Sequence, residues 1–149
     1  MQRPYLTVEP ISWDRIAELN RWAAREGCGA VVTFVGVVRA DRCGARTIQA
    51  LRYDAYAEMA EQLIRHSVEE AMMRWSLTSA HIQHRLGLVD VGHPSVVVVV
   101  AAPHRDHAYA ASQFLIERIK QHAPVWKREH YHDSTSQWMG QRMGPHAHV

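Results

Sequence analysis

The chain has 149 residues, which is enough for one domain with a sizeable hydrophobic core. Hydrophobic residues make up 47% and charged residues 21% of it, a composition that excludes an intrinsically disordered protein. The formal net charge of +2 is too small to indicate a nucleic-acid-binding protein, although it allows a local cationic pocket for a small anion. Cys28 and Cys43 indicate neither a disulfide framework nor a metal site. The N-terminus has no signal-peptide core and no apolar run is long enough to span a membrane, so we expect a cytoplasmic protein.

Apolar periodicity and turn residues predict six strands and three helices. Residues 5–8 are predicted to form a short strand, and Ser12 is placed to cap the helix that follows. The apolar stripe of this helix would consist of Trp13, Ile16, Leu19 and Ala23. A β-branched run over residues 30–38 predicts a buried strand, and residues 40–46 are typical of a loop. We expect residues 47–56 to form a second strand paired with this run.

The second half of the chain continues the alternation of strands and helices. Its elements are predicted as a helix over residues 57–75, a strand over 80–86, a strand over 95–102, a helix over 107–122 and a strand over 125–132, followed by a C-terminal tail over 133–149. Five consecutive valines indicate that the strand over 95–102 is central and covered on both faces. The order of the elements predicts an α+β fold, with helices packed on a mixed sheet, in one domain over residues 1–149.

Lys120 and Lys127 are the only two lysines, whereas positive charge elsewhere is carried by arginine. Arginine stays protonated, but a lysine can lose its proton or attack a carbonyl when its surroundings lower its pKa. Only a short Ala-Pro turn separates the predicted helix end from the next strand, so the two amines could face one pocket. Neighbouring positive charges, Arg128 among them, would then lower their pKa. Strand alternation could equally point Lys127 outward, and two surface lysines placed together by chance is the simpler interpretation.

Cationic side chains also stand where two buried strands end. His104 and Arg105 follow the valine strand, and Asp106 is placed to cap the next helix, whose free N–H groups would suit an anion. Arg39 stands in the same way at the exit of the strand over 30–38. The interest of these residues depends on whether Arg39 and Arg105 converge with the two lysines, because each alone is equally well explained as a solvated turn.

Histidine and tryptophan patterns indicate less. His130 and His132 share a predicted strand face. No third potential ligand follows at a sequence spacing typical of zinc sites, so we expect no native metal. Three tryptophans are expected in the core or in an interface: Trp13, Trp22 and Trp75.

Several segments, in this order and at this spacing, resemble the catalytic, large subunit of molybdopterin synthase. They are residues 32–39 (VTFVGVVR), 104–105 (HR), 114–120 (FLIERIK), 123–129 (APVWKRE) and Trp138, of which the stretch over 120–129 is the most specific. The resemblance implies an α/β-hammerhead fold and a homodimer of large subunits within a heterotetramer. It also implies two small ubiquitin-like sulfur-carrier subunits, each inserting a C-terminal Gly-Gly thiocarboxylate.

The implied activity is that of a sulfurtransferase of molybdenum cofactor biosynthesis, with no cofactor. Two sulfurs would pass from the carriers to cyclic pyranopterin monophosphate (precursor Z) and form the dithiolene of molybdopterin. By position, Lys120 and Lys127 match the catalytic lysines, expected to act on the thiocarboxylate and in proton transfer. The substrate-binding residues implied by the match are Val37, Val38, Arg39, His104, Arg105, Lys120, Lys127, Arg128, Glu129 and Arg142. Arg142 matches an arginine that reaches the site from the other protomer. Val37 stands where some relatives carry a lysine, so only its backbone could contact the substrate.

Two hypotheses from different classes therefore remain at this point. The first is the sulfurtransferase, which needs amine chemistry at both lysines. The second is a non-catalytic dimeric module that binds a phosphorylated metabolite or an acidic protein tail, for which arginine would serve as well as lysine.

Overall fold

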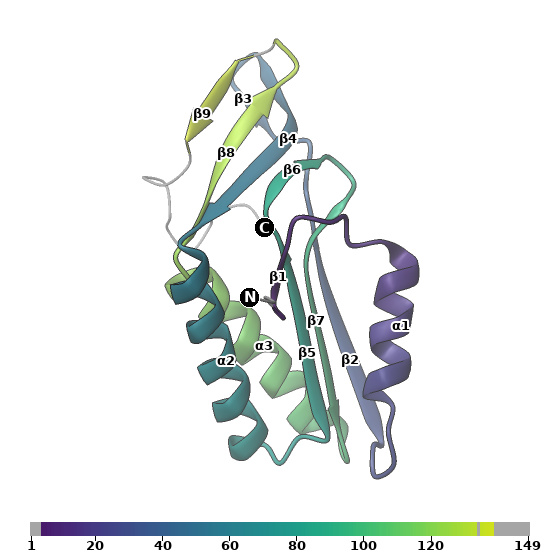
Figure 1. The fold of residues 1–149 in the computed structure, drawn as a ribbon. Helices are drawn as coiled ribbons and strands as arrows, with labels where there is room; N and C mark the ends of the chain where they lie inside the picture. The colour runs from purple at the N-terminus through teal and green to yellow at the C-terminus, as the bar shows by residue number, and fades with distance from the viewer. Residues whose placement is uncertain (1–3, 134, 139–149) are drawn as a thin grey trace.

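The computed structural model describes residues 4–133 and 135–138. Its helices and strands are β1 (Leu6–Thr7), α1 (Trp13–Ala23), β2 (Ala30–Val37), β3 (Arg42–Cys43), β4 (Arg46–Ala55), α2 (Ala57–Arg74), β5 (Ser79–Arg85), β6 (Gly87–Asp90), β7 (Pro94–Ala102), α3 (Arg105–His122), β8 (Val125–Tyr131) and β9 (Ser136–Trp138). They form two sheets, and the fold is the predicted α+β arrangement (Figure 1). None of the helices in the described ranges is both long and apolar enough to cross a membrane.

The first sheet has the order β1-β5-β7-β2, and the valine strand β7 lies inside it. Strand β7 pairs antiparallel with β2 and β5, whereas β1 pairs parallel with β5, so the sheet is mixed as predicted. Every residue of β7 is buried.

Alternate valines of β7 supply two separate hydrophobic cores, because successive side chains of a strand point to opposite faces of the sheet. Val96, Val98 and Val100 pack in the core beneath α2 and α3. Val97 and Val99 pack in the core beneath α1, together with Ile16 and Leu19. Figure 1 shows the resulting layers, with α2 and α3 on one face of the sheet and α1 on the other. The prediction of a central strand covered on both faces is confirmed.

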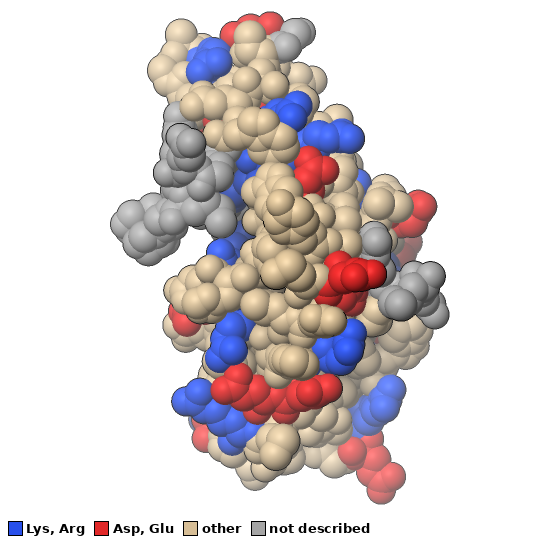
Figure 2. All heavy atoms as spheres, turned by 60° about the vertical axis from the view of Figure 1, so that its left-hand side comes forward, with Lys and Arg blue, Asp and Glu red and all other residues tan. Residues whose placement is uncertain are grey.

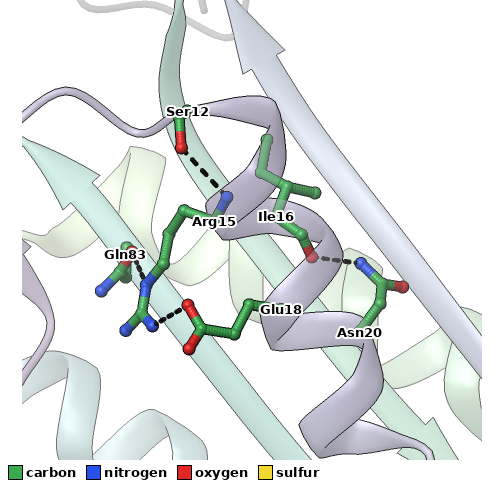
Figure 3. Close-up of polar contacts among 6 residues, drawn as sticks. All are labelled: Ser12, Arg15, Ile16, Glu18, Asn20 and Gln83. Atoms are coloured by element: carbon green, nitrogen blue, oxygen red, sulfur yellow. Dashed lines mark hydrogen bonds and ion pairs between the residues drawn. The ribbon is translucent and has the colours of Figure 1, made fainter.

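Helix α1 begins as its sequence predicts. The hydroxyl of Ser12 accepts a hydrogen bond from the backbone N–H of Arg15 at 3.0 Å (Figure 3). The guanidinium of Arg15 reaches Glu18 at 2.9 Å and Gln83 of β5 at 3.4 Å, which ties the helix to the sheet. Trp13 is not part of the buried stripe, because 60% of it is exposed.

The second sheet has the order β3-β4-β8-β9, with β6 also paired to β4. It forms a lobe beyond one end of the first sheet (Figure 1). A third hydrophobic cluster fills it, made of Val38, Ile48, Leu51, Tyr53, Val89 and Tyr131. The chain passes from the first sheet to this lobe after β2, whose register shifts between Gly36 and Val37.

Three sequence-based predictions are wrong in detail, and one strand was missed. Strand β4 does not pair with β2, since it pairs with β6 and β8 while β2 pairs with β7. The predicted loop over 40–46 contains β3, and the predicted tail contains β9. Strand β6 was not predicted. The short strands β3, β6 and β9 carry too few residues to show a period.

Candidate active site

Strand β8 turns Lys127 into the protein. Its alternate residues Lys127, Glu129 and Tyr131 are buried, whereas Trp126 and Arg128 on the other face are partly exposed. Only 5% of Lys127 is accessible to solvent, and its Nζ atom has no hydrogen-bond partner among the described residues. An ammonium group in such a place is costly because it has lost its hydration.

Lys120 lies in the last turn of α3, immediately before the turn that leads into β8. Burial lowers the pKa of Lys120 to about 8. The pKa of Lys127 is lowered to about 7, chiefly by burial and next by the charge of Lys120. The two amines are therefore close neighbours and are withdrawn from solvent, so the interpretation as two surface lysines placed by chance is wrong.

Charged side chains of both signs also act on Lys127. The charge of Arg39 lowers the pKa of Lys127, while Glu129 and Asp41 raise it. The guanidinium of Arg39 lies 3.3 Å from the carboxylate of Asp41 and is 60% exposed, so it can meet a ligand at the mouth of the site. Arg39 thus joins the lysine pair, as the sequence suggested.

Glu129 is fully buried behind Lys127. Its carboxylate accepts a hydrogen bond from the hydroxyl of Tyr131, and the thiol of Cys43 lies 3.5 Å from the same oxygen. The guanidinium of Arg46 covers the ring of Tyr131 at 4.2 Å. The carboxylate is therefore held inside the lobe, where its charge partly offsets the depression of the pKa of Lys127.

A histidine that the sequence did not bring to attention lies beside the lysine pair. His84 of β5 is 3% exposed, and its Nδ1 lies 2.8 Å from the backbone carbonyl of Arg85. The pKa of His84 is lowered to about 4, chiefly by burial, and the charges of Lys120 and Lys127 contribute to this shift. Its ring meets that of Tyr53 edge to face at 5.2 Å. The one signal for it in the sequence is its alternation with Ile82 on the buried side of the strand.

Val37 and Val38 lie where β2 ends. Val38 is buried in the core of the lobe, its N–H donates to the carbonyl of His93, and its carbonyl accepts from the N–H of Gly92. Val37 pairs with Pro94 at the irregular end of the strand. The two valines therefore hold the chain segment that delivers Arg39.

His104 and Arg105 lie at the other end of α3 from Lys120. They line a surface hollow of about 430 Å³ together with Asp106. Fifteen residues of helix separate Arg105 from Lys120, which corresponds to about 22 Å at 1.5 Å per residue. The convergence of Arg105 with the lysines, which the sequence left open, does not occur within one chain. Asp106 does not cap α3 either, since the N-cap is His104 and no side chain caps the helix there.

Arg128 does not join the lysine pair. Arg128 faces away from it, and its guanidinium stacks on the ring of Trp138 at 4.1 Å. Its charge is consequently not among those that depress the pKa of Lys127, contrary to expectation. Arg142 lies outside the described residues. His130 is on the face of Arg128, and no cluster of three potential metal ligands occurs in residues 4–133 and 135–138.

The surface agrees with a localised cationic site rather than a broad basic face. Lys and Arg atoms reach the surface in the recess between the lobe and the helices, while acidic and basic side chains alternate over the helical part below (Figure 2). The face seen in Figure 2 does not have the continuous basic stripe of a nucleic-acid-binding protein.

Comparison with known proteins identifies relatives over most of the chain. Residues 6–122 match the family profile described as MoaE protein. The chain is 41% identical over 143 residues to the molybdopterin synthase catalytic subunit of Bacillus subtilis (strain 168), covering 96% of this chain and 88% of that protein.

Two solved structures are similar in fold. The crystal structure of molybdopterin synthase from Staphylococcus aureus matches with a TM-score of 0.82 and 34% identity, over 94% of this chain and 98% of that chain. A protein-protein complex of subunits 1 and 2 of molybdopterin-converting factor from Helicobacter pylori 26695 matches with a TM-score of 0.79 over 93% of this chain and 90% of that chain. At 23% identity the second likeness shows the fold alone.

Proposed function

The chain belongs to the MoaE family of molybdopterin synthase catalytic subunits, and we propose that it transfers sulfur from the C-terminal thiocarboxylate of a small carrier subunit to precursor Z. The observation that carries this proposal is the pairing of half-buried Lys120 with buried Lys127, whose pKa values are lowered to about 8 and about 7. A binding site for an anion alone needs positive charge but gains nothing from amines that can lose it. Perturbed lysines in a recess are typical of acid-base or nucleophilic chemistry.

The two lysines would divide the work because their pKa values differ. Lys127, with a pKa of about 7, is half neutral at physiological pH and can accept a proton or attack the carbonyl of the thiocarboxylate. Lys120, with a pKa of about 8, is mostly protonated there and can donate hydrogen bonds to the anionic tail. A pair of like groups with separated pKa values supplies one base and one acid at the same pH.

Arg39 would hold the negatively charged pterin at the mouth of the site. Its guanidinium is exposed, and a planar fork of donors suits a phosphate. The Asp41 carboxylate beside it orients the guanidinium and would be displaced or shared when the ligand binds.

His104 and Arg105 would complete the site from a second copy of the chain. They are too far from the lysines to act in the same protomer, yet they line a hollow of their own. In a homodimer, His104 and Arg105 of one copy would face Lys120 and Lys127 of the other, with Arg142 also supplied in trans. The carrier subunit would then insert its Gly-Gly tail toward the lysine pair, giving the heterotetramer.

Single substitutions Lys120→Ala and Lys127→Ala test the proposal. Each should reduce the conversion of precursor Z by thiocarboxylated carrier at least 100-fold, with an unchanged circular dichroism spectrum. Gln121→Ala, an exposed neighbour on the same helix, is the matched control and should keep full activity. Full activity in both lysine variants would overturn the assignment.

The double variant Lys120→Arg and Lys127→Arg separates the enzyme from a binding module. Arginine keeps the charge but cannot act as a base, so the enzyme should lose activity while still binding the carrier. A protein whose biological role survives this exchange is a binding module.

A further inference from the structure

Neither amine of the lysine pair has a hydrogen-bond acceptor within the described residues. Nζ of Lys127 is buried and makes no hydrogen bond to any described residue. Oε2 of Glu129 accepts from Tyr131 and the hydroxyl of Ser95 donates to the carbonyl of Gly36, and neither contact involves Nζ of Lys127. An ammonium group that forms in this space needs an acceptor of its own.

His84 lies close to the pair through Tyr53. It touches Tyr53, and Tyr53 is the direct cross-strand neighbour of Lys127 on the inner face of the lobe. The contact of Nδ1 with the carbonyl of Arg85 identifies the tautomer, because a carbonyl can only accept and Nδ1 must therefore carry the hydrogen. In the neutral ring, Nε2 then keeps a free lone pair, and the contact with Arg85 is the one hydrogen bond of this imidazole within the described residues.

We propose that His84 is a positioning residue of the lysine pair, whose Nε2 accepts the hydrogen bond of an amine of the pair when that amine carries a proton. The low pKa of His84, about 4, keeps the ring neutral and its lone pair available over the working range of the lysines. A protonated imidazole would instead add a positive charge to a cluster that already holds Lys120, Lys127 and Arg39. This inference deepens the proposed function and rests on it for the use made of the amines.

The lysine count makes a direct measurement possible. Selective isotope labelling of lysine in the full chain gives two side-chain signals, which Lys120→Arg and Lys127→Arg assign. Their chemical shifts followed against pH give the pKa of each amine without substrate or carrier. If the chain proved not to transfer sulfur, the titration would still test the role of His84. If the titration showed no role for His84, the proposed sulfur transfer would still stand.

Two substitutions of His84 are expected to act in opposite ways. His84→Phe keeps the ring and its contact with Tyr53 but removes the acceptor, and should lower the pKa of one lysine by about one unit. His84→Gln places an acceptor oxygen near the position of Nε2 and should restore at least half of that shift. Where activity is measurable, the pH-rate profile should move with the same lysine.

His81→Phe is the matched control. His81 lies on the same strand three residues away, faces α1 with Arg15 and Arg25, and should leave both lysine signals unchanged when substituted. If His84→Phe destabilises the chain too far for titration, His84→Asn keeps a donor for the Arg85 carbonyl and lacks the acceptor at the position of Nε2. Unchanged or raised lysine pKa values in His84→Phe, or in His84→Asn when it replaces Phe, would overturn the proposal. An equal shift in His81→Phe would do the same.

Discussion

Tyr53 and Lys127 lie directly opposite each other on the antiparallel strands β4 and β8, and both point into the protein. Burial raises the pKa of Tyr53 to about 12, so its hydroxyl stays neutral beside the amine. The same burial lowers the pKa of Lys127 to about 7. The reactivity proposed for this site originates in the burial of Lys127 beside Tyr53, a neutral side chain that does not stabilise the charge of the ammonium group.

The rate of sulfur transfer should rise with pH through about 7, because the neutral form of Lys127 is the active one. At saturating substrate, an increase of about fivefold is expected between pH 6 and pH 8, since the neutral fraction of Lys127 rises about tenfold while the protonated fraction of Lys120 falls by about half. The pH-rate profile of the purified complex checks this. A midpoint near the ordinary lysine value of 10.5 would show that the amine is not perturbed as described.

Lys127→Met should be more stable than the parent chain at pH 7, by a few kcal/mol. The unfolded lysine binds its proton up to about pH 10.5, whereas the folded one releases it above about pH 7. The unfolded state therefore binds more protons between these values, and the stability of the parent chain rises with pH across that window. The advantage of the methionine variant is largest at or below pH 7 and shrinks toward pH 10.5.

Urea denaturation at pH 7 and pH 10 measures this difference. Lys120→Met is the comparison variant, and its advantage should be smaller because the pKa of Lys120 is lowered only to about 8. A methionine variant that is less stable at both pH values would contradict the linkage.

Mixing two inactive variants should restore activity if the site is shared between protomers. Arg105→Ala removes a group that each protomer supplies to its partner's site, and Lys127→Ala removes a group that each protomer supplies to its own site. In a mixed dimer both defects fall in one site and the other site is intact, so an equimolar, re-equilibrated mixture should regain about a quarter of parental activity. Mixing Lys120→Ala with Lys127→Ala is the control, since each site would then keep one defect. Equal recovery in both mixtures would refute a site shared in this way.

Gly29→Ala should destabilise the protein by more than about 2 kcal/mol. A Cβ atom at Gly29 would lie 2.1 Å from the backbone oxygen of Pro103, and a backbone atom cannot rotate away. The shift would also displace the start of α3, where His104 and Arg105 lie. The midpoint of chemical denaturation measures the loss. Gly44→Ala, with φ of +64° but open space around it, should cost only about 1 kcal/mol, and an equal cost at both positions would exclude the clash as the cause.

Much of the fold could be predicted because its signals are local. The Ser12 cap needs only residues within one turn, and the valines of β7 show their double burial in their composition. The pairing of β4 could not be predicted, because its alternation fits any partner strand that offers an apolar face. The length of the predicted helix already places Arg105 and Lys120 at opposite ends of it. Their separation within one chain could therefore have been predicted from the sequence.

The sequence by itself determined which chemistry the chain can perform: two amines in a protein that otherwise uses arginine, placed beside a helix end and a turn. It also determined the family, because the residues over 120–129 keep their order and spacing. The tertiary structure decided whether those amines are reactive. The pKa of a lysine depends on lost hydration and on charges within a few ångströms, and residues as distant in sequence as Arg39, His84 and Lys127 meet only when two sheets and a helix pack together.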